Sequence, residues 1–416
     1  MDLSSHPEGL LDQWAETLFA NDTLAGRRAE GLVVLQVLPE LDTGGVERGS
    51  VDLANFIAME GGLALVASAG GRMEQKLDRQ GCIHIKMPLH SKNPITILRN
   101  ARRLRKVIRD YRVNIVHARS RAPAWAAERA CRKSGAFFVT TAHGPYNFNN
   151  RFKKRYNAIM ASSQRVIAVS HFISSYLQQS YHTPPEKIHV IHRGVDLDEF
   201  NEGAITSLRI ARMVSAWRLP EDRQIVVLPG RLTGWKGQKL FIEAIANLKH
   251  LQLCCLMVGS HQGRQDYFEE LRALIKKHEL EDTISIVGNC DDMPTLYKLA
   301  DVVVSASIEP EAFGRVVAEA QAMGTLPVAP DHGGAVEQIV SGENGFLFSS
   351  GNAAEMSVAI EAALNLDLHE NTRMRENAIQ SVQKSFSKSR MCRLTLAVYW
   401  ELIHNETPYG TDNYRG

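Results

Sequence analysis

Two carboxylates, Glu311 and Glu319, flank the start of a predicted helix and are the residues of this sequence that most suggest chemistry. The apolar, β-branched run 301–305 predicts a buried strand just before them, and the helix is predicted to open near Gly314. Glu319 then lies about five residues inside the helix, roughly 7.5 Å further along its axis. Free N–H groups and the positive dipole end lie between the carboxylates and suit a phosphate.

A surface ion pair is the alternative reading of Glu319, which follows Arg315 by four residues on the flank of the helix. The order arginine then glutamate is the weaker orientation for such a pair, which slightly favours a ligand role. A nucleotide-sugar, with hydroxyl-bearing groups on both sides of its phosphates, fits this layout. Glu309 is a third carboxylate nearby, but only Glu311 has the eight-residue offset to Glu319.

Arg231 and Lys236 lie in a glycine-bearing loop directly after the predicted strand 225–228. Arginine binds a pyrophosphate through planar bidentate hydrogen bonds, and lysine adds a compact charge. The loop lacks the G-x-x-x-x-G-K-[ST] pattern of a P-loop. Two solvated surface charges are the alternative.

The N-terminal half offers two weaker candidates. Gly44 and Gly45 fall at a predicted strand-to-helix turn, where a backbone without Cβ can approach a ligand closely, although G-x-G-x-x-G is missing. His143 follows the predicted strand 137–140 and could hydrogen-bond a substrate or act as acid or base. An ordinary loop and an inert histidine remain the alternatives.

A basic amphipathic stretch predicts contact with an anionic membrane surface, with a solvated helix face as the alternative. Aromatic residues do not interleave with its charges, which argues against nucleic acid. Its cations are Arg99, Arg102, Arg103, Arg105, Lys106, Arg109 and Arg112, and a second cluster, Arg151, Lys153, Lys154 and Arg155, could extend it.

The composition predicts a soluble two-domain protein. The chain has 416 residues, a formal net charge of +2 and 44% hydrophobic residues, enough for two cores and no global reason to expect nucleic acid. The six cysteines show no C-x-x-C spacing and are read as reduced thiols of a cytoplasmic protein. No signal peptide and no membrane-spanning run are recognised.

Short apolar runs alternate with helical patterns along the chain, which predicts doubly wound parallel sheets with ligands at the carboxyl ends of the strands. Residues 1–30 form an extension with a short helix carrying Leu10, Leu11, Trp14, Leu18 and Phe19. The expected domains are 31–198 and 199–384, followed by a helix at 385–416 that packs back across the interface. Strands are expected at 32–38, 63–67, 83–85, 114–117, 137–140, 166–169 and 188–191, then at 225–228, 254–258, 284–287, 302–305 and 326–329.

These pieces, in this order, resemble the GT-B glycosyltransferases of family 4, which are retaining and depend on nucleotide-sugars. The matching stretches are GGVER, THGPYN, AVSHFI, VIHRGVDLDEF, PGRLTGWKG and EAFGRVVAEAQAMGTLPVAPDHGGAVEQI. The resemblance covers about residues 31 to 403. Many relatives have asparagine where Arg193 stands.

The resemblance implies that the first domain holds the acceptor and the second the donor. Glu319 would bind the ribose, Glu311 the donor sugar, and the backbone of Phe313, Gly314 and Arg315 the sugar and phosphates. Arg231 and Lys236 would neutralise the leaving diphosphate, Gly44 and Gly45 would close over it, and His143 would lie near the reacting centre. No metal and no further cofactor would be required.

The expected acceptor is a glycan or lipid-linked hydroxyl in lipopolysaccharide or other envelope polysaccharide synthesis, on the inner face of the cytoplasmic membrane. A sugar-nucleotide 2-epimerase of the same fold and a non-catalytic nucleotide-sugar-binding protein remain alternatives. The donor base and sugar, the linkage and the oligomeric state are not readable.

Overall fold

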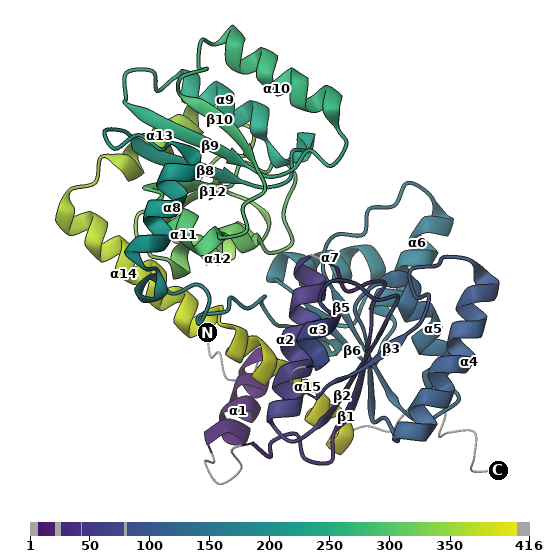
Figure 1. Ribbon diagram of the computed structural model, residues 1–416. Helices are drawn as coiled ribbons and strands as arrows, with labels where there is room; N and C mark the ends of the chain where they lie inside the picture. The colour runs from purple at the N-terminus through teal and green to yellow at the C-terminus, as the bar shows by residue number, and fades with distance from the viewer. Residues whose placement is uncertain (1–6, 21–25, 43, 79–80, 406–416) are drawn as a thin grey trace, which may run out of the picture. The chain divides into compact units, whose positions relative to one another are not determined.

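A computed structural model describes residues 7–20, 26–42, 44–78 and 81–405 of the protein (Figure 1). The chain divides into two compact units. Unit 1 comprises Met1–Gly194 and Lys388–Gly416, and unit 2 comprises Val195–Ser387. Each unit contains one parallel sheet with helices on both faces, so the predicted pair of doubly wound Rossmann-like sheets is confirmed.

The sheet of unit 1 has the strand order β3-β2-β1-β4-β5-β6-β7, and neighbouring strands pair in parallel. β-branched and other apolar residues fill these strands because a sheet covered on both faces has no solvent side. The strands are β1 (Val33–Val37), β2 (Leu63–Ser68), β3 (Ile83–Lys86), β4 (Ile115–Ala118), β5 (Phe137–Ala142), β6 (Arg165–Ala168) and β7 (Ile188–Val190).

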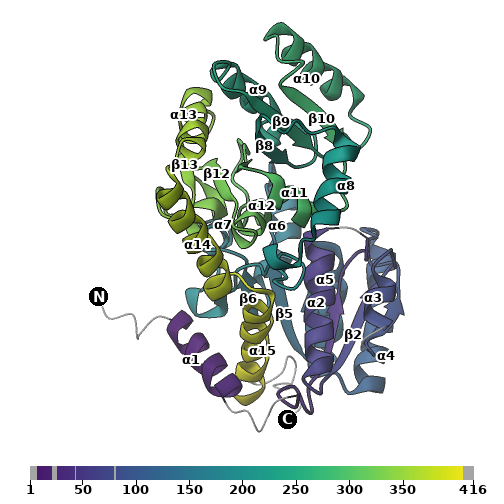
Figure 2. The same cartoon turned by 60° about the vertical axis from the view of Figure 1, so that its left-hand side comes forward.

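Two hydrophobic cores lie on the two faces of this sheet. One face carries α1 (Pro7–Ala20), α2 (Gly45–Met59) and α15 (Lys388–Asn405), which lie together in Figure 2. The other carries α4 (Pro94–Tyr111) and α5 (Arg121–Cys131). The remaining helices are α3 (Glu74–Asp78), α6 (Arg151–Asn157) and α7 (His171–Tyr181).

The sheet of unit 2 has the order β10-β9-β8-β11-β12-β13, again with parallel pairings. Its strands are β8 (Gln224–Pro229), β9 (Leu253–Val258), β10 (Ile284–Gly288), β11 (Val302–Val304), β12 (Leu326–Pro330) and β13 (Phe346–Phe348). One core includes residues of α9 (Gln238–Ala246), α10 (Gln265–Lys277) and α13 (Ala353–Leu364). The other includes residues of α8 (Ser207–Trp217), α11 (Met293–Leu299), α12 (Arg315–Ala322) and α14 (Leu368–Ser385).

The helix expected in the first thirty residues is α1, which packs on α15 with Leu11 buried. The side chains of Leu10 and Trp14 lie outside the described residues. Every expected strand is present, and β13 is an additional strand that was not predicted from the sequence. The final helix belongs to unit 1, where it packs on α1 and α2.

The strand order of each sheet reverses at one point, between β1 and β4 in unit 1 and between β8 and β11 in unit 2. Loops that leave neighbouring strands in opposite directions open a crevice there, at the carboxyl ends of the strands. The predicted site residues follow these strands or their neighbours. No described helix is long and apolar enough to cross a membrane.

Candidate functional site

The loops that leave β8 and β11 touch each other at the reversal point of unit 2. The Ile308 N–H donates to the Trp235 carbonyl oxygen at 2.9 Å. Gly237 has a left-handed φ of 71°, and a Cβ there would lie 1.8 Å from the Ala306 carbonyl oxygen. Only glycine permits this approach, which fixes the loop carrying Lys236 against the loop carrying Glu311.

Lys236 and Glu311 form the centre of the site. Lys236 Nζ lies 2.7 Å from Glu311 Oε1 and 4.5 Å from the centre of the Trp235 ring. The Ser307 hydroxyl donates to the same carboxylate oxygen. Both charged side chains are mostly buried, at 14% and 19% exposure, so the pair is weakly screened by water. The structure therefore brings these two predicted residues together and adds Ser307, which the sequence reading missed.

Glu319 lies one helical turn from the start of α12 and is held on two sides. Arg315 donates through Nη2 at 2.7 Å and through Nε at 3.0 Å to Glu319 Oε1. The Tyr297 hydroxyl donates to Oε2 at 3.3 Å. The ion pair considered as the alternative is thus formed, but at 13% exposure Glu319 is not a solvated surface carboxylate. Burial, followed by the neighbouring carboxylate, raises the pKa of Tyr297 well above its usual value, so the phenol stays a donor.

Hydrogen bonds from the turn after β12 hold the loop between Glu311 and α12 in place. Gly334 N–H donates to the Glu311 carbonyl oxygen at 2.9 Å, and Gln338 donates to the Phe313 carbonyl oxygen. The Phe313 side chain is 3% exposed and packs against Phe386, so only its backbone can face a ligand. Gly314, with a left-handed φ of 82°, precedes the first residue of α12. Its conformation ends the loop and starts the helix.

Arg231 extends into solvent from the same loop as Lys236, and its side chain has no hydrogen bond or ion pair with any described residue. The Thr233 hydroxyl nearby is buried without a partner. The site thus combines the unpaired Arg231, two cations held by carboxylates, Lys236 and Arg315, and the N-terminus of α12. That combination can bind a diphosphate and take up charge that develops on it.

In unit 1, Gly44 and Gly45 lie at the N-terminus of α2. Gly44 is the N-cap residue of α2 and has extended backbone dihedrals. Glycine offers no side-chain oxygen to the first N–H groups of α2, which need an acceptor from elsewhere. Thr43, just before them, lies outside the described residues.

His143 follows β5 and is partly exposed, yet both of its ring nitrogens are buried and have no hydrogen-bond partner in the described protein. Burial lowers its pKa well below the usual value, and the charges of Arg193 and Arg119 add to this. The ring is neutral at pH 7. A neutral ring can donate one hydrogen bond and accept another.

A buried network supports the same region and was not found from the sequence. His117 on β4 bonds Thr141 Oγ1 through Nε2 and the Tyr399 hydroxyl through Nδ1, both at 2.6 Å. Burial, with the charge of Arg119, lowers the pKa of His117 well below its usual value. Histidine on β4 and tyrosine on the last helix carried no local signal, because the two residues are far apart in the sequence.

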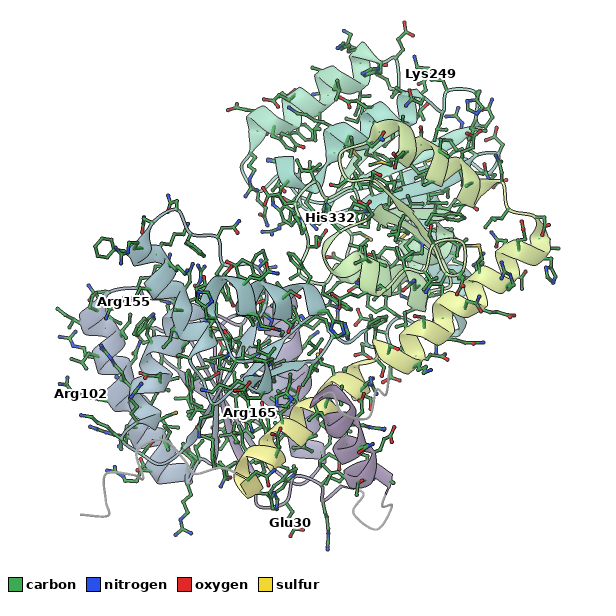
Figure 3. All side chains as sticks on the ribbon, turned by 180° about the vertical axis from the view of Figure 1, so that it is seen from behind. Glu30, Arg102, Arg155, Arg165, Lys249 and His332 are labelled. Atoms are coloured by element: carbon green, nitrogen blue, oxygen red, sulfur yellow. The ribbon has the colours of Figure 1, made fainter. Side chains whose placement is uncertain are left out.

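The predicted basic stretch forms α4 and its C-cap. Ile97, Leu104 and Ile108 pack inward, while Arg99, Arg102, Arg103, Arg105, Lys106 and Arg109 are all exposed. Figure 3 shows Arg102 and Arg155, labelled on α4 and α6, both pointing outward from unit 1. Phe152 on α6 is 88% exposed.

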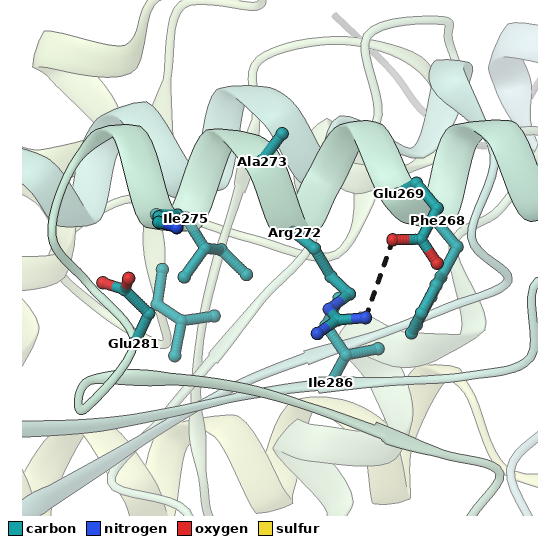
Figure 4. Close-up of a pocket in the computed structure, with 9 residues that line it drawn as sticks. Phe268, Glu269, Arg272, Ala273, Ile275, Glu281 and Ile286 are labelled. Atoms are coloured by element: carbon teal, nitrogen blue, oxygen red, sulfur yellow. Dashed lines mark ion pairs between the residues drawn. The ribbon is translucent and has the colours of Figure 1, made fainter.

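A separate groove lies between α10 and the edge strand β10 (Figure 4). Phe268 and Ile286 line it, and Arg272 lies 3.6 Å from Glu269. None of the predicted site residues lines this groove.

Two family models match the chain. "Glycosyltransferase Family 4" matches residues 43–199, and "Glycosyl transferases group 1" matches residues 211–381. The first match covers most of unit 1 and the second most of unit 2.

A solved glycosyltransferase from Rickettsia africae is similar with a TM-score of 0.84 and 38% identity, over 90% of this chain and 99% of the other. HepE from Anabaena, solved with UDP and glucose, gives a TM-score of 0.77 at 23% identity over 89% and 100% of the two chains, which shows the fold alone. D-inositol 3-phosphate glycosyltransferase 1 from Catenulispora acidiphila is 29% identical over 256 residues, and the match spans 59% of each chain.

Proposed function

This chain belongs to the GT-B glycosyltransferases of family 4, and we propose that it moves a sugar, with retained anomeric configuration, from a nucleotide-diphosphate sugar to an acceptor hydroxyl. The contact between Lys236 Nζ and Glu311 Oε1, 2.7 Å apart beside the start of α12, carries the proposal. It combines a cation for the leaving group with a carboxylate for sugar hydroxyls.

Electrostatic preorganisation is the proposed source of rate. Negative charge develops on the departing diphosphate, and Lys236, Arg231 and the N-terminus of α12 are positioned to stabilise it. These cations supply the charge that a divalent metal would otherwise provide, so the proposed reaction is metal-independent. The acceptor would attack from the face that the diphosphate leaves, with the phosphate helping to remove the acceptor proton. Neutral His143 would hydrogen-bond the donor sugar.

Glu319 is proposed to bind the ribose hydroxyls. Arg315 and Tyr297 hold its carboxylate in place, and a carboxylate oxygen has more than one lone pair to offer. HepE was solved with UDP-glucose, so UDP-glucose is the first donor to test, followed by GDP- and ADP-sugars.

The proposed acceptor is a glycan or lipid-linked hydroxyl of an envelope polysaccharide such as lipopolysaccharide, at the inner face of the cytoplasmic membrane. The exposed cations of α4 support this placement, because each cation near an anionic surface contributes about 1 kcal/mol. Vesicles with anionic lipid should therefore co-sediment the protein at low salt. Replacing Arg102, Arg103 and Arg105 by glutamate should abolish this, whereas glutamate at the exposed Lys276 and Lys277 of unit 2 should not.

The decisive experiment measures sugar release and transfer from each nucleotide-sugar by the intact protein and by Glu311→Ala. Wild-type turnover that the variant loses while keeping its fold supports a transferase. Isomerisation of the donor without any acceptor would instead identify a 2-epimerase. Nucleotide-sugar binding with no turnover in either protein would identify a binding protein.

A further inference from the structure

Unit 1 contains a small cavity between α2, the carboxyl ends of its strands and α15 that none of the roles above uses. Two arginines line it, Arg119 after β4 and Arg193 after β7, at 5% and 9% exposure. Gly49, Thr141 and Thr395 line it as well. A buried guanidinium group that has no partner is costly to keep there unless an anion accompanies it.

Arg119 is the more informative of the two. Its side chain has no hydrogen bond and no ion pair with any described residue, and its Nε is buried without a partner. Burial lowers the pKa of Arg119, while Tyr399 and Cys392 of α15 and then Asp52 and Glu47 of α2 act in the opposite direction. Arginine stays charged in proteins, so the buried charge calls for a partner from outside the chain.

Gly49 lets the two guanidinium groups converge below α2. A Cβ at this position would lie 2.9 Å from Arg193 Nη1 and 3.3 Å from Arg119 Nη2. Any side chain at position 49 would therefore intrude between them. Both charges also act on His143, whose ring nitrogens have no partner. Donors from three loops, those after β4, β5 and β7, thus gather at one place.

We propose that this cavity binds an oxyanion, a phosphate or carboxylate, carried by the acceptor, and that Arg119 and Arg193 select anionic acceptors. The inference rests on the proposed transferase function. The donor diphosphate already has its own cations, Arg231 and Lys236, in unit 2. The space in the cavity is about that of one water molecule, so one oxygen of the anion would enter between the guanidinium groups.

Binding by the full-length protein tests the site directly. The measurement is the Tm of thermal unfolding, made in a Lys236→Ala variant whose donor site is weakened. The ligands are inorganic phosphate, glucose 6-phosphate, galacturonate and neutral glucose. Sodium chloride at the same ionic strength is the control for each. Phosphate and glucose 6-phosphate should raise Tm in a saturable way, and glucose should not. A response to galacturonate instead would assign the site to a carboxylate.

Arg119→Gln should weaken this binding at least tenfold and Arg193→Gln should weaken it too. Arg129→Gln, an exposed arginine on α5 of the same unit, should not. Equal binding by Arg119→Gln and the parent protein would overturn the proposal. So would a Tm shift no larger than that in chloride for every ligand tested.

Stability without ligand separates a binding role from a structural one. Because Arg119 has no partner among the described residues, Arg119→Gln should leave the Tm of the ligand-free protein unchanged or raise it. A lowered Tm or a failure to fold would mean that Arg119 is structural, and would also overturn the proposal.

Failure of the transferase proposal gives a different result. If UDP- and other nucleotide-sugars neither bind nor react while phosphate still stabilises through Arg119, the oxyanion site stands and the donor assignment falls. If transfer is found, Arg119→Gln should raise the acceptor KM at least tenfold and leave the donor KM unchanged. A raised donor KM with an unchanged acceptor KM would place the oxyanion on the donor and overturn the proposal.

Discussion

The reversal points of the two sheets differ in whether their buried charges have partners. In unit 2, the buried charges are paired, Glu311 with Lys236 and Glu319 with Arg315, and only the exposed Arg231 is unpaired among the described residues of the site. In unit 1, Arg119 is buried with no pairing in the described protein, and His117 and His143 are neutral. One fold thus supports a site whose buried charges are paired and a site with a buried charge that has no partner among the described residues.

The two sites therefore offset the desolvation cost of their buried charges in different ways. A buried pair is stable without ligand, but removing one partner strands the other charge. A buried lone cation destabilises the empty protein and gains stability when an anion binds. Mutations should therefore separate the two units by the sign of their effect on stability as well as by activity.

The largest expected effect belongs to Lys236→Ala. It removes the cation nearest the proposed leaving group and strands Glu311, so kcat/KM for donor cleavage should fall by about 10²–10³. Lys239→Ala is the matched control, since Lys239 lies three residues on, is half exposed and pairs with Glu270. Steady-state kinetics measure both. Activity within tenfold of wild type in Lys236→Ala would remove this residue from the proposed mechanism.

Gly333→Ala tests the support of the Glu311 loop. Its φ is +62° and the new Cβ would lie 2.5 Å from the Glu311 carbonyl oxygen, so strain and a backbone clash combine. A loss of about 2–3 kcal/mol of unfolding free energy is expected, together with reduced turnover. Gly342→Ala, with a φ of +81° and no neighbour within 4 Å, should cost only the strain, about 1 kcal/mol. Equal losses in urea unfolding would show that the clash is relieved elsewhere.

Glu401→Gln examines a charge pair of unit 1 away from the cavity. Burial raises the pKa of Glu401, but His189 and Arg165 lower it overall to about 2. A depressed carboxyl pKa stabilises the fold above the unfolded pKa of about 4.5, and this stability is lost as pH falls toward 2. The variant should lose about 2 kcal/mol at pH 7 and much less at pH 3.

Urea unfolding at both pH values measures the Glu401 effect. Glu361→Gln, which breaks a more exposed pair with His250, should change stability by less than about 0.5 kcal/mol at pH 7. A loss that did not depend on pH would contradict the charge argument for Glu401.

The smallest effect is expected for Glu319→Gln. Loss of charge-assisted hydrogen bonds to ribose should weaken nucleotide binding about tenfold, or about 1.4 kcal/mol. Glu309→Gln, an exposed carboxylate in the preceding loop, should bind as wild type does. Isothermal titration with UDP distinguishes them. If Glu319→Gln bound UDP with unchanged affinity, Glu319 would not bind the ribose, and its role would be limited to the ion pair with Arg315.

Sequence patterns predicted the elements whose structure depends on neighbouring residues, and they did not predict contacts between distant segments. The apolar runs located the strands because buried parallel strands are apolar throughout, and the turn before Gly314 with the apolar pattern after it located α12. β13 was missed because Phe346–Phe348 is too short to show a period. Tyr297, His117 and Tyr399 were missed because their partners come from distant segments. Arg119 was not selected, since burial of a charge cannot be read from a run of residues.

The position of α15 has a consequence for synthesis of the protein. Leu396, Ala397, Val398, Tyr399 and Leu402 of this last helix are fully buried in a core of unit 1. A ribosome therefore completes all of unit 2 before the final piece of unit 1 emerges. Unit 2 has its whole sequence available first, so the N-terminal unit should be the last to reach its native state during translation. In a nascent chain arrested before residue 388, unit 1 lacks this helix. Proteases should therefore cleave unit 1 faster there than in the full-length protein.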